Sequence, residues 1–161
     1  MGTNYIRIDD RLIHGQIVAR WSKHLNINDI IVIDDKTASN STLKSIMAMS
    51  VPKQYKTTIC TMAEFQDVVE ELNNKDENNL IIMRFPYLVE EVLKTGIDVV
   101  SINIGNVSKR DNESKEIIPN IYLSKEDIEV IEKLYTENVQ VFFQLVPDSQ
   151  NISWDKARKN I

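Results

Sequence analysis

The chain has few of the features that mark specialised classes of protein. It holds one cysteine, Cys60, so an internal disulfide framework is excluded and a reducing compartment is indicated. Its apolar runs all fall short of the roughly 20 residues that span a bilayer, and residues 1–10 lack the apolar segment of a signal peptide. Basic residues number 19 against 24 acidic ones, which argues against nucleic acid as a general partner. We therefore expect a cytoplasmic protein that binds no nucleic acid.

Sequence motifs for bound cofactors are also lacking. There is no glycine-rich dinucleotide fingerprint, no phosphate-cradling loop ending in Gly-Lys-Ser/Thr, and no histidine or cysteine cluster with metal-ligand spacing. The acidic pair Asp9-Asp10 follows a predicted first strand, where such pairs can bind Mg²⁺. That kind of site also needs an aspartate at the end of the third strand, where this chain has Thr61. We therefore expect neither a cofactor nor a metal, and side chains must carry the chemistry.

Strand and helix patterns alternate along all 161 residues, which predicts one domain over residues 1–161. Such alternation is typical of an α/β fold with an open, mostly parallel doubly wound sheet and helices on both faces. One antiparallel strand is allowed at an edge. The predicted strands are 5–8, 29–34, 56–61, 80–85, 99–104, 121–123 and 139–146. Helices are predicted after Gly15, over 39–51, after Thr61, after Pro86, after Ser124 and over 155–159, with a loop or loose hairpin at 108–119.

The stretch from Asn4 to Trp21 places His14 where the first strand passes into the first helix. The first turn of a helix carries unpaired N–H groups and partial positive charge, which favour an anion. Arg11 adds a guanidinium that suits phosphate oxygens, and Gly15 permits a positive φ close to a ligand. Because imidazole is a nucleophile near neutral pH, these residues together predict a phosphoryl site at His14.

Simpler interpretations of these polar residues stay open from spacing alone. His14 can be a loop histidine hydrogen-bonded to Asp9 or Asp10, and His24 is expected to be a solvated residue near the end of the first helix. The pair Asp34-Asp35 can reach the same rim of the site, but we expect it to form a solvated turn. Arg84 and Asn106 lie at the ends of predicted strands, and spacing does not decide whether either lines the site.

The sequence RIDDRLIHGQ followed by Trp21 resembles the signature of a bacterial family. It is similar to the B subunits (EIIB, type 4) of the mannose/fructose/sorbose family of the phosphoenolpyruvate-dependent sugar phosphotransferase system. The resemblance covers nearly the whole chain, although Ser39-Asn40 and Arg84-Phe85-Pro86 depart from the pattern expected for the family. Weaker matches in the family's order are Asp34-Asp35 with Ala38, Pro52, residues 102–106, residues 124–127 and Val146-Pro147.

The resemblance implies a phosphotransferase in which His14 accepts a phosphoryl group on Nδ1 from the A subunit and passes it to a sugar. That sugar arrives through membrane C and D subunits, so the chain is expected in the cytoplasm, peripherally attached to the membrane through them. Arg11 matches the arginine that contacts the phosphoryl group. A weak homodimer is also allowed. Further pocket candidates are Arg7, Asp9, Asp10, Gly15 and Gln16.

Transfer between two partners favours a shallow site, and we expect apolar docking residues around it, with Leu12, Ile13 and Phe85 as candidates. Two other functions compete with this one. A histidine phosphatase needs arginine directly before the histidine and a second active-site histidine, but Ile13 stands before His14 and His24 is badly placed. A phosphorylation-responsive regulatory or docking protein with the same fold is the other alternative.

Overall fold

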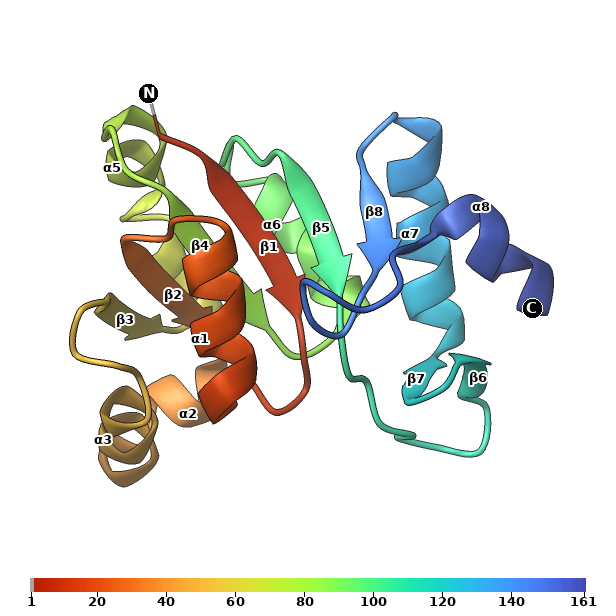
Figure 1. Ribbon diagram of the computed structural model, residues 1–161, viewed down its shortest axis with the longest axis horizontal. Helices are drawn as coiled ribbons and strands as arrows, with labels where there is room; N and C mark the ends of the chain where they lie inside the picture. Colours follow the sequence, from red (N-terminus) through yellow and green to blue (C-terminus); the bar gives the residue numbers. More distant parts are fainter. Residues whose placement is uncertain (1) are drawn as a thin grey trace.

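A central parallel sheet organises the molecule (Figure 1). The computed structural model describes residues 2–161, apart from the side chain of Gln16. The strand order is β3-β2-β4-β1-β5-β8-β9, with every pair parallel except β8 and β9. The sheet strands are β1 (Asn4–Ile8), β2 (Asp29–Ile33), β3 (Lys56–Cys60), β4 (Asn79–Met83), β5 (Ser101–Ile104), β8 (Val141–Phe143) and β9 (Ile152–Ser153). The predicted fold class is confirmed, including the antiparallel edge strand, and β1 lies in the middle.

Helices cover both faces of this sheet (Figure 1). They are α1 (Gly15–His24), α2 (Asp35–Ala38), α3 (Ser41–Met49), α4 (Met62–Phe65), α5 (Val69–Asn74), α6 (Val89–Leu93), α7 (Lys125–Thr136) and α8 (Trp154–Ala157), with 3-10 turns η1 (Pro86–Leu88) and η2 (Arg158–Asn160). A separate antiparallel hairpin joins β6 (Lys115–Ile118) to β7 (Ile121–Leu123). The loop or loose hairpin predicted over 108–119 thus contains the first strand of this hairpin, and the second strand is the one predicted over 121–123. Among the described residues, no helix is both long and apolar enough to cross a bilayer.

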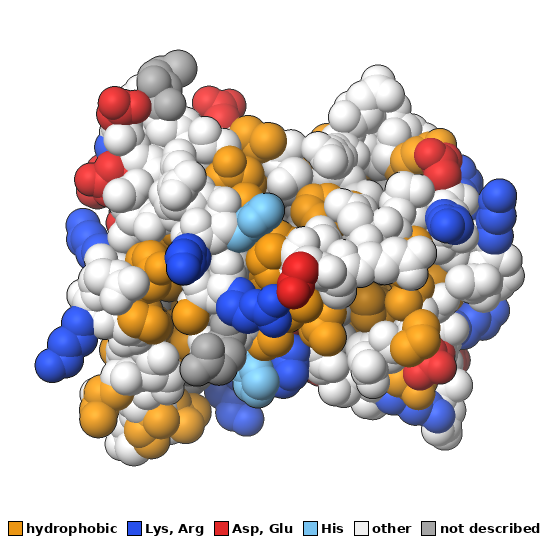
Figure 2. Space-filling view, in the orientation of Figure 1, with side chains coloured by type: hydrophobic (Ala, Val, Ile, Leu, Met, Phe, Trp, Pro, Cys, Tyr) orange, Lys and Arg blue, Asp and Glu red, His pale blue; other side chains and the backbone are white. Residues whose placement is uncertain are grey.

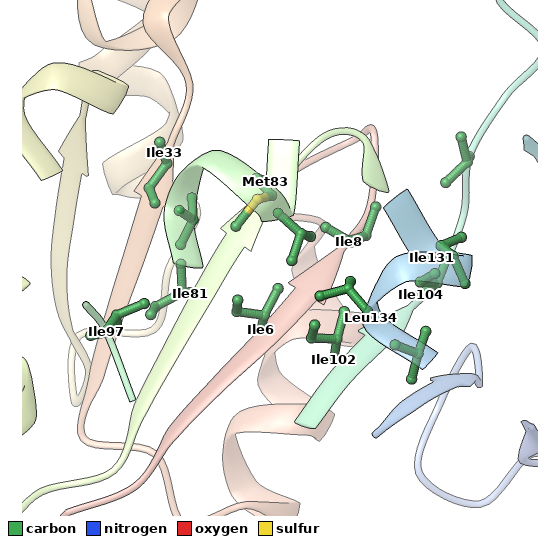
Figure 3. Packing of buried hydrophobic residues seen from close by; sticks show 14 of the residues in the cluster. Ile6, Ile8, Ile33, Ile81, Met83, Ile97, Ile102, Ile104, Ile131 and Leu134 are labelled. Carbon is green, nitrogen blue, oxygen red and sulfur yellow. The ribbon is translucent and has the colours of Figure 1, made fainter. Parts of the chain in front are cut away.

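Two hydrophobic cores follow from the alternation of side chains along the strands. In β2, Ile31 and Ile33 join the core under α5, α6 and α7, whereas Ile30 and Val32 join the core under α1. Figure 3 shows the first core, in which isoleucines of β1, β4 and β5 lie side by side. Burial on both faces explains why β2 reads as a continuous apolar run. Cys60 is buried here, and burial raises the pKa of its thiol to about 11.

Several predicted elements differ from the structure. The strand expected over 139–146 is shorter at both ends, spanning Val141–Phe143, and the next two carbonyl groups accept hydrogen bonds from Arg7. The helix after Thr61 is divided into α4 and α5. The helix expected over 39–51 becomes α2 and α3, and α3 buries none of its residues (Figure 2, lower left). Half-buried Met47 packs against the core under α1, but the exposed fraction of Ile46 is 59% and that of Met49 is 83%.

Candidate active site

The connection between β1 and α1 has a defined conformation at the carboxyl edge of the sheet. The backbone N–H of Asp9 donates to the carbonyl of Met83 at 3.0 Å, which extends the pairing of β1 with β4 by one bond. Leu12 has a positive φ of 57° and its side chain is buried beneath the loop. Gly15 has a φ of 27°, as its identity predicted. The connection thus buries the side chains of Leu12 and Ile13 and leaves His14 exposed.

Asp9 is the centre of the charges in this loop, because its carboxylate accepts hydrogen bonds from two arginines. Arg11 donates from Nε at 2.9 Å and from Nη2 at 2.9 Å, while Arg7 donates from Nη2 at 3.3 Å. The Asp9 side chain is only 1% exposed. A carboxylate occupied in this way by two cations does not suit Mg²⁺, so the arrangement disfavours the metal-site alternative.

Arg7 is a buried arginine on the central strand, with a side chain only 2% exposed. It donates to the carbonyl groups of Gln144 and Leu145, each at 3.1 Å, and to the side chain of Asn103. Its guanidinium also lies 5.3 Å from the ring centroid of Trp21. Burial lowers the pKa of Arg7 to about 10, still far above neutrality, so it remains a cation beneath Asp9.

Arg11 lies above Asp9 and is partly open to solvent, with a side-chain exposure of 34%. Its hydrogen bond to Asp9 is the main reason that the pKa of Arg11 is raised. Asp9 takes the Nε and Nη2 edge of the guanidinium, so this pair does not use Nη1. Arg11 is thus a fixed cation with an edge available for a second anion, which fits its predicted role.

His14 is the N-cap residue of α1 and is exposed. Its carbonyl accepts from Ile17 N–H at 2.9 Å, while its side chain makes no capping hydrogen bond. The alternative of a histidine satisfied by Asp9 or Asp10 does not fit, because other donors hold both carboxylates. Both histidine side chains of the chain are visible on the surface in Figure 2.

His24 is exposed at the opposite end of α1, as expected, and its ring packs edge-on to Trp21 with 5.9 Å between centroids. A rise of about 1.5 Å per residue separates the two histidines by roughly 15 Å along the helix. His24 therefore cannot act as the second histidine of a phosphatase site around His14.

Asp10 joins the loop to the region after β5. Its carboxylate accepts from Asn106 Nδ2 at 2.9 Å and from the Ser108 backbone N–H at 2.7 Å. Its own N–H donates to the Asn106 carbonyl at 2.9 Å. Asn106 therefore lines the loop from the β5 side, which spacing alone left open.

Asp34 and Arg84 form a pair at the rim. Arg84 donates to the Asp34 carboxylate at 3.0 and 3.3 Å and to the Asp10 carbonyl at 2.6 Å. The expectation of a solvated turn is wrong for Asp34, which is 11% exposed and caps α2. Asp35 is exposed, and its carboxylate accepts from the N–H of Met62 at 2.8 Å.

The predicted ring of apolar docking residues is wrong at two positions. Leu12 and Ile13 are buried in the core under α1, because the positive φ at Leu12 turns the loop inward. Phe85 is half-buried between Tyr87, which stacks on it, and the guanidinium of Arg110. The side chain of Gln16, another pocket candidate, lies outside the described part of the chain.

The chain matches the family described as "PTS system sorbose subfamily IIB component" over residues 3–160. The chain belongs to this family. IIB components of this system are phosphotransferases, so the predicted family and enzyme class are confirmed. The mannose-specific EIIAB component of Escherichia coli (strain K12) is 27% identical over 135 residues, which are 84% of this chain and 42% of that relative. The IIB chain thus spans less than half the length of that protein.

Solved structures agree with the family. The manxB protein of Thermoanaerobacter tengcongensis has a TM-score of 0.88 at 28% identity, covering 99% of the IIB chain and 96% of that chain. The IIB domain of the sorbose permease from Klebsiella pneumoniae has a TM-score of 0.90 at 24% identity, covering 100% and 99%. This second likeness shows the shared fold.

Sequence reasoning missed several residues that complete the site. Asn103 and the carbonyl groups of Gln144 and Leu145 hold Arg7, and Gly105 leaves room for its guanidinium. One signal was present in the sequence: an arginine within an apolar strand predicts a buried cation that needs several acceptors. Nothing in the sequence indicated that those acceptors come from the end of β8.

Proposed function

We propose that this IIB component carries a phosphoryl group on His14 between the A subunit and a sugar. The observation that supports it best is the exposed imidazole of His14 at the carboxyl edge of the central strand, on the same loop as the anchored Arg11. Ligands of open α/β sheets bind at this edge. Phosphoryl transfer asks the protein mainly for alignment and charge stabilisation, which this loop supplies.

The proposed transfer has two steps, and in each step one bond to phosphorus forms while another breaks. In the first, Nδ1 of His14 attacks phosphorus, a new N–P bond forms, and the bond to the donor nitrogen of the A subunit breaks. In the second, a sugar hydroxyl oxygen attacks the same phosphorus, the N–P bond of His14 breaks, and the hydroxyl proton is released. Because both sides of the first step are phosphohistidines, that exchange is close to balanced and reversible.

The other loop residues have supporting roles in this proposal. Arg11 stabilises the charged phosphoryl oxygens through the edge that Asp9 leaves unused. Asp9 orients Arg11, and buried Arg7 fixes Asp9 from below. Asp10 holds the loop to the β5 side, and Gly15 lets the chain enter α1. Gln16 remains a pocket candidate from the sequence alone.

The partners are proposed on the same basis. The phosphorylated A subunit is the donor, and the membrane C and D subunits present the sugar. Residues 1–161 act as one IIB domain in the cytoplasm, attached peripherally to the membrane through C and D, with a weak homodimer allowed. An exposed histidine suits this exchange because two partners must reach it in turn.

Labelling from phosphoenolpyruvate tests the proposal. The chain is incubated with ³²P-phosphoenolpyruvate, the general phosphotransfer proteins and the A subunit, and the labelled residue is identified by mass spectrometry. We expect one acid-labile label on His14 that a sugar removes when membranes holding C and D are added. A wild-type chain that takes no label contradicts the proposal, and a label that no sugar removes favours the regulatory alternative. Steady His14-dependent hydrolysis of a generic phosphomonoester would instead support a phosphatase.

Arg11→Ala should keep the fold but lose most of the transfer. Arg11 is one-third exposed, so truncation costs little packing, whereas the forming phosphoryl charge loses its main side-chain partner. We expect transfer to fall by roughly 100-fold, the size seen when a charge-stabilising donor is removed. Rapid-quench transfer rates from the phosphorylated A subunit measure it, with Arg158→Gln on η2 as a surface-arginine control. A rate within twofold of wild type removes Arg11 from the mechanism.

A further inference from the structure

Arg84 connects three parts of the molecule at the carboxyl edge of the sheet. It directly follows β4, which lies between β2 and β1 in the sheet. Its guanidinium donates through Nε and Nη2 to the carboxylate of Asp34, which follows β2. Its Nη1 donates at 2.6 Å to the carbonyl of Asp10, which lies on the loop after β1. One side chain thus ties the His14 loop to the loop beside it.

Asp34 is itself a fixed anchor. Its carboxylate caps α2 by accepting from the backbone N–H of Thr37 at 3.2 Å and from the Thr37 hydroxyl at 2.6 Å. Burial alone would raise the pKa of Asp34, but the hydrogen bonds from Arg84 and Thr37 outweigh it and lower the pKa. The carboxylate is therefore ionised at neutral pH, and Arg84 is held against a helix terminus.

The loop that carries His14 is also held from the β5 side by an independent contact. Asn106 and the Ser108 N–H bind the Asp10 carboxylate from the β5 side. Arg84 binds the Asp10 carbonyl from the β4 side. The residue next to Asp10 in the chain is Arg11. The two contacts fix the peptide from which the phosphoryl-stabilising arginine projects.

We propose that Arg84 is a positioning residue for phosphoryl transfer, which sets the His14 loop by clamping the Asp10 carbonyl to Asp34. This inference rests on the proposed function of His14. The role depends on the fork of the guanidinium, because Nε, Nη1 and Nη2 are each used and their acceptors lie on two different loops. Arg84 uses all three of its nitrogens within the protein, whereas Arg11 leaves Nη1 unused, so Arg84 does not act as a second phosphoryl cation.

Lysine and glutamine substitutions at Arg84 distinguish a positioning role from a role as a phosphoryl-binding cation. Lysine keeps the charge but cannot bind Asp34 and Asp10 together in the same geometry, whereas glutamine removes the charge as well. We expect Arg84→Lys and Arg84→Gln to slow transfer at saturating donor by a similar factor, roughly 10- to 100-fold, with the KM for the phosphorylated A subunit nearly unchanged. Asp34→Asn should slow transfer in the same direction, because it weakens the anchor while leaving Arg84 charged.

Amide hydrogen exchange of the peptide over residues 9–15 gives a readout independent of activity. We expect exchange there to be at least several-fold faster in both Arg84 variants, with the Arg158→Gln control unchanged. Near-wild-type transfer by Arg84→Lys, unchanged or faster transfer by Asp34→Asn, or unaltered loop exchange would each overturn the positioning role. Failure of the wild-type chain to be labelled on His14 would instead reject the proposed function, so the two failures are distinguishable.

Discussion

A His14→Ala variant should take no label from the phosphorylated A subunit while folding like the wild type. The nucleophile is absent, so the N–P bond on which both steps depend cannot form. The expected loss is complete within detection, at least a thousandfold by the scale of nucleophile deletions. Little stability is lost, because the imidazole is exposed and makes no capping hydrogen bond to α1. Autoradiography and a thermal melt measure the two quantities on the same preparation.

His24→Ala is the matched control, because the chain contains only two histidines. Its ring packs against Trp21 at the far end of α1, so the variant should lose a few tenths of a kcal/mol of stability, up to about 1 kcal/mol. Its labelling should equal that of the wild type. Label retained by His14→Ala, or lost only in His24→Ala, would refute the assignment of the phosphoryl carrier.

Gly105→Ala should destabilise the folded state by about 3 kcal/mol, in the range of overpacking combined with disruption of a buried charge pair. A Cβ at this position would collide with Nη2 of Arg7 and lie 2.7 Å from its Cζ. A side-chain end normally moves away, but this one is buried and bonded to Asp9 and to the carbonyl of Leu145. For a chain of this length the melting temperature should fall by roughly 10 °C.

Gly15→Ala separates backbone strain from collision in the same assay. A Cβ on Gly15 meets nothing within 4 Å, so the variant carries only the strain of a positive φ, about 1–2 kcal/mol. A smaller melting-temperature shift for Gly105→Ala than for Gly15→Ala would show that Arg7 is free to move. In that case Arg7 would not be the rigid support of Asp9.

The fold was largely predictable because its local signals agree with its packing. Thr61 and Ser124, after which helices were predicted, each form a capping box, and Asn138 has the left-handed conformation just beyond the end of α7. Periodicity predicted a helix over 39–51 but not the exposure of α3, which buries none of its residues. A hydrophobic stripe predicts that a helix is amphipathic, but it does not specify what, if anything, covers the apolar side.

The site was predictable only where its residues are consecutive. His14, Arg11 and Gly15 stand out because they lie together between a strand and a helix. The contact between Arg84 and Asp34 joins residues 50 positions apart, and only the strand order brings them together. The burial of Leu12 depends on its positive φ, a conformation that the leucine side chain itself disfavours.

The position of β1 in the middle of the sheet also determines when the site can form during folding. The strand pairs with β4 and β5. Arg7 makes its hydrogen bonds only after the carbonyl groups of Gln144 and Leu145, which are 137 and 138 positions later in the chain, have packed beside it. Contacts this distant in sequence form slowly, because the closing loops are long. A nascent chain in which His14 has been synthesised but Leu145 has not therefore lacks the contacts that hold Arg7, and through Arg7 it lacks the support of Asp9 and Arg11. Under the proposed function, competence for transfer is therefore gained late, after residues 144 and 145 have packed against β1.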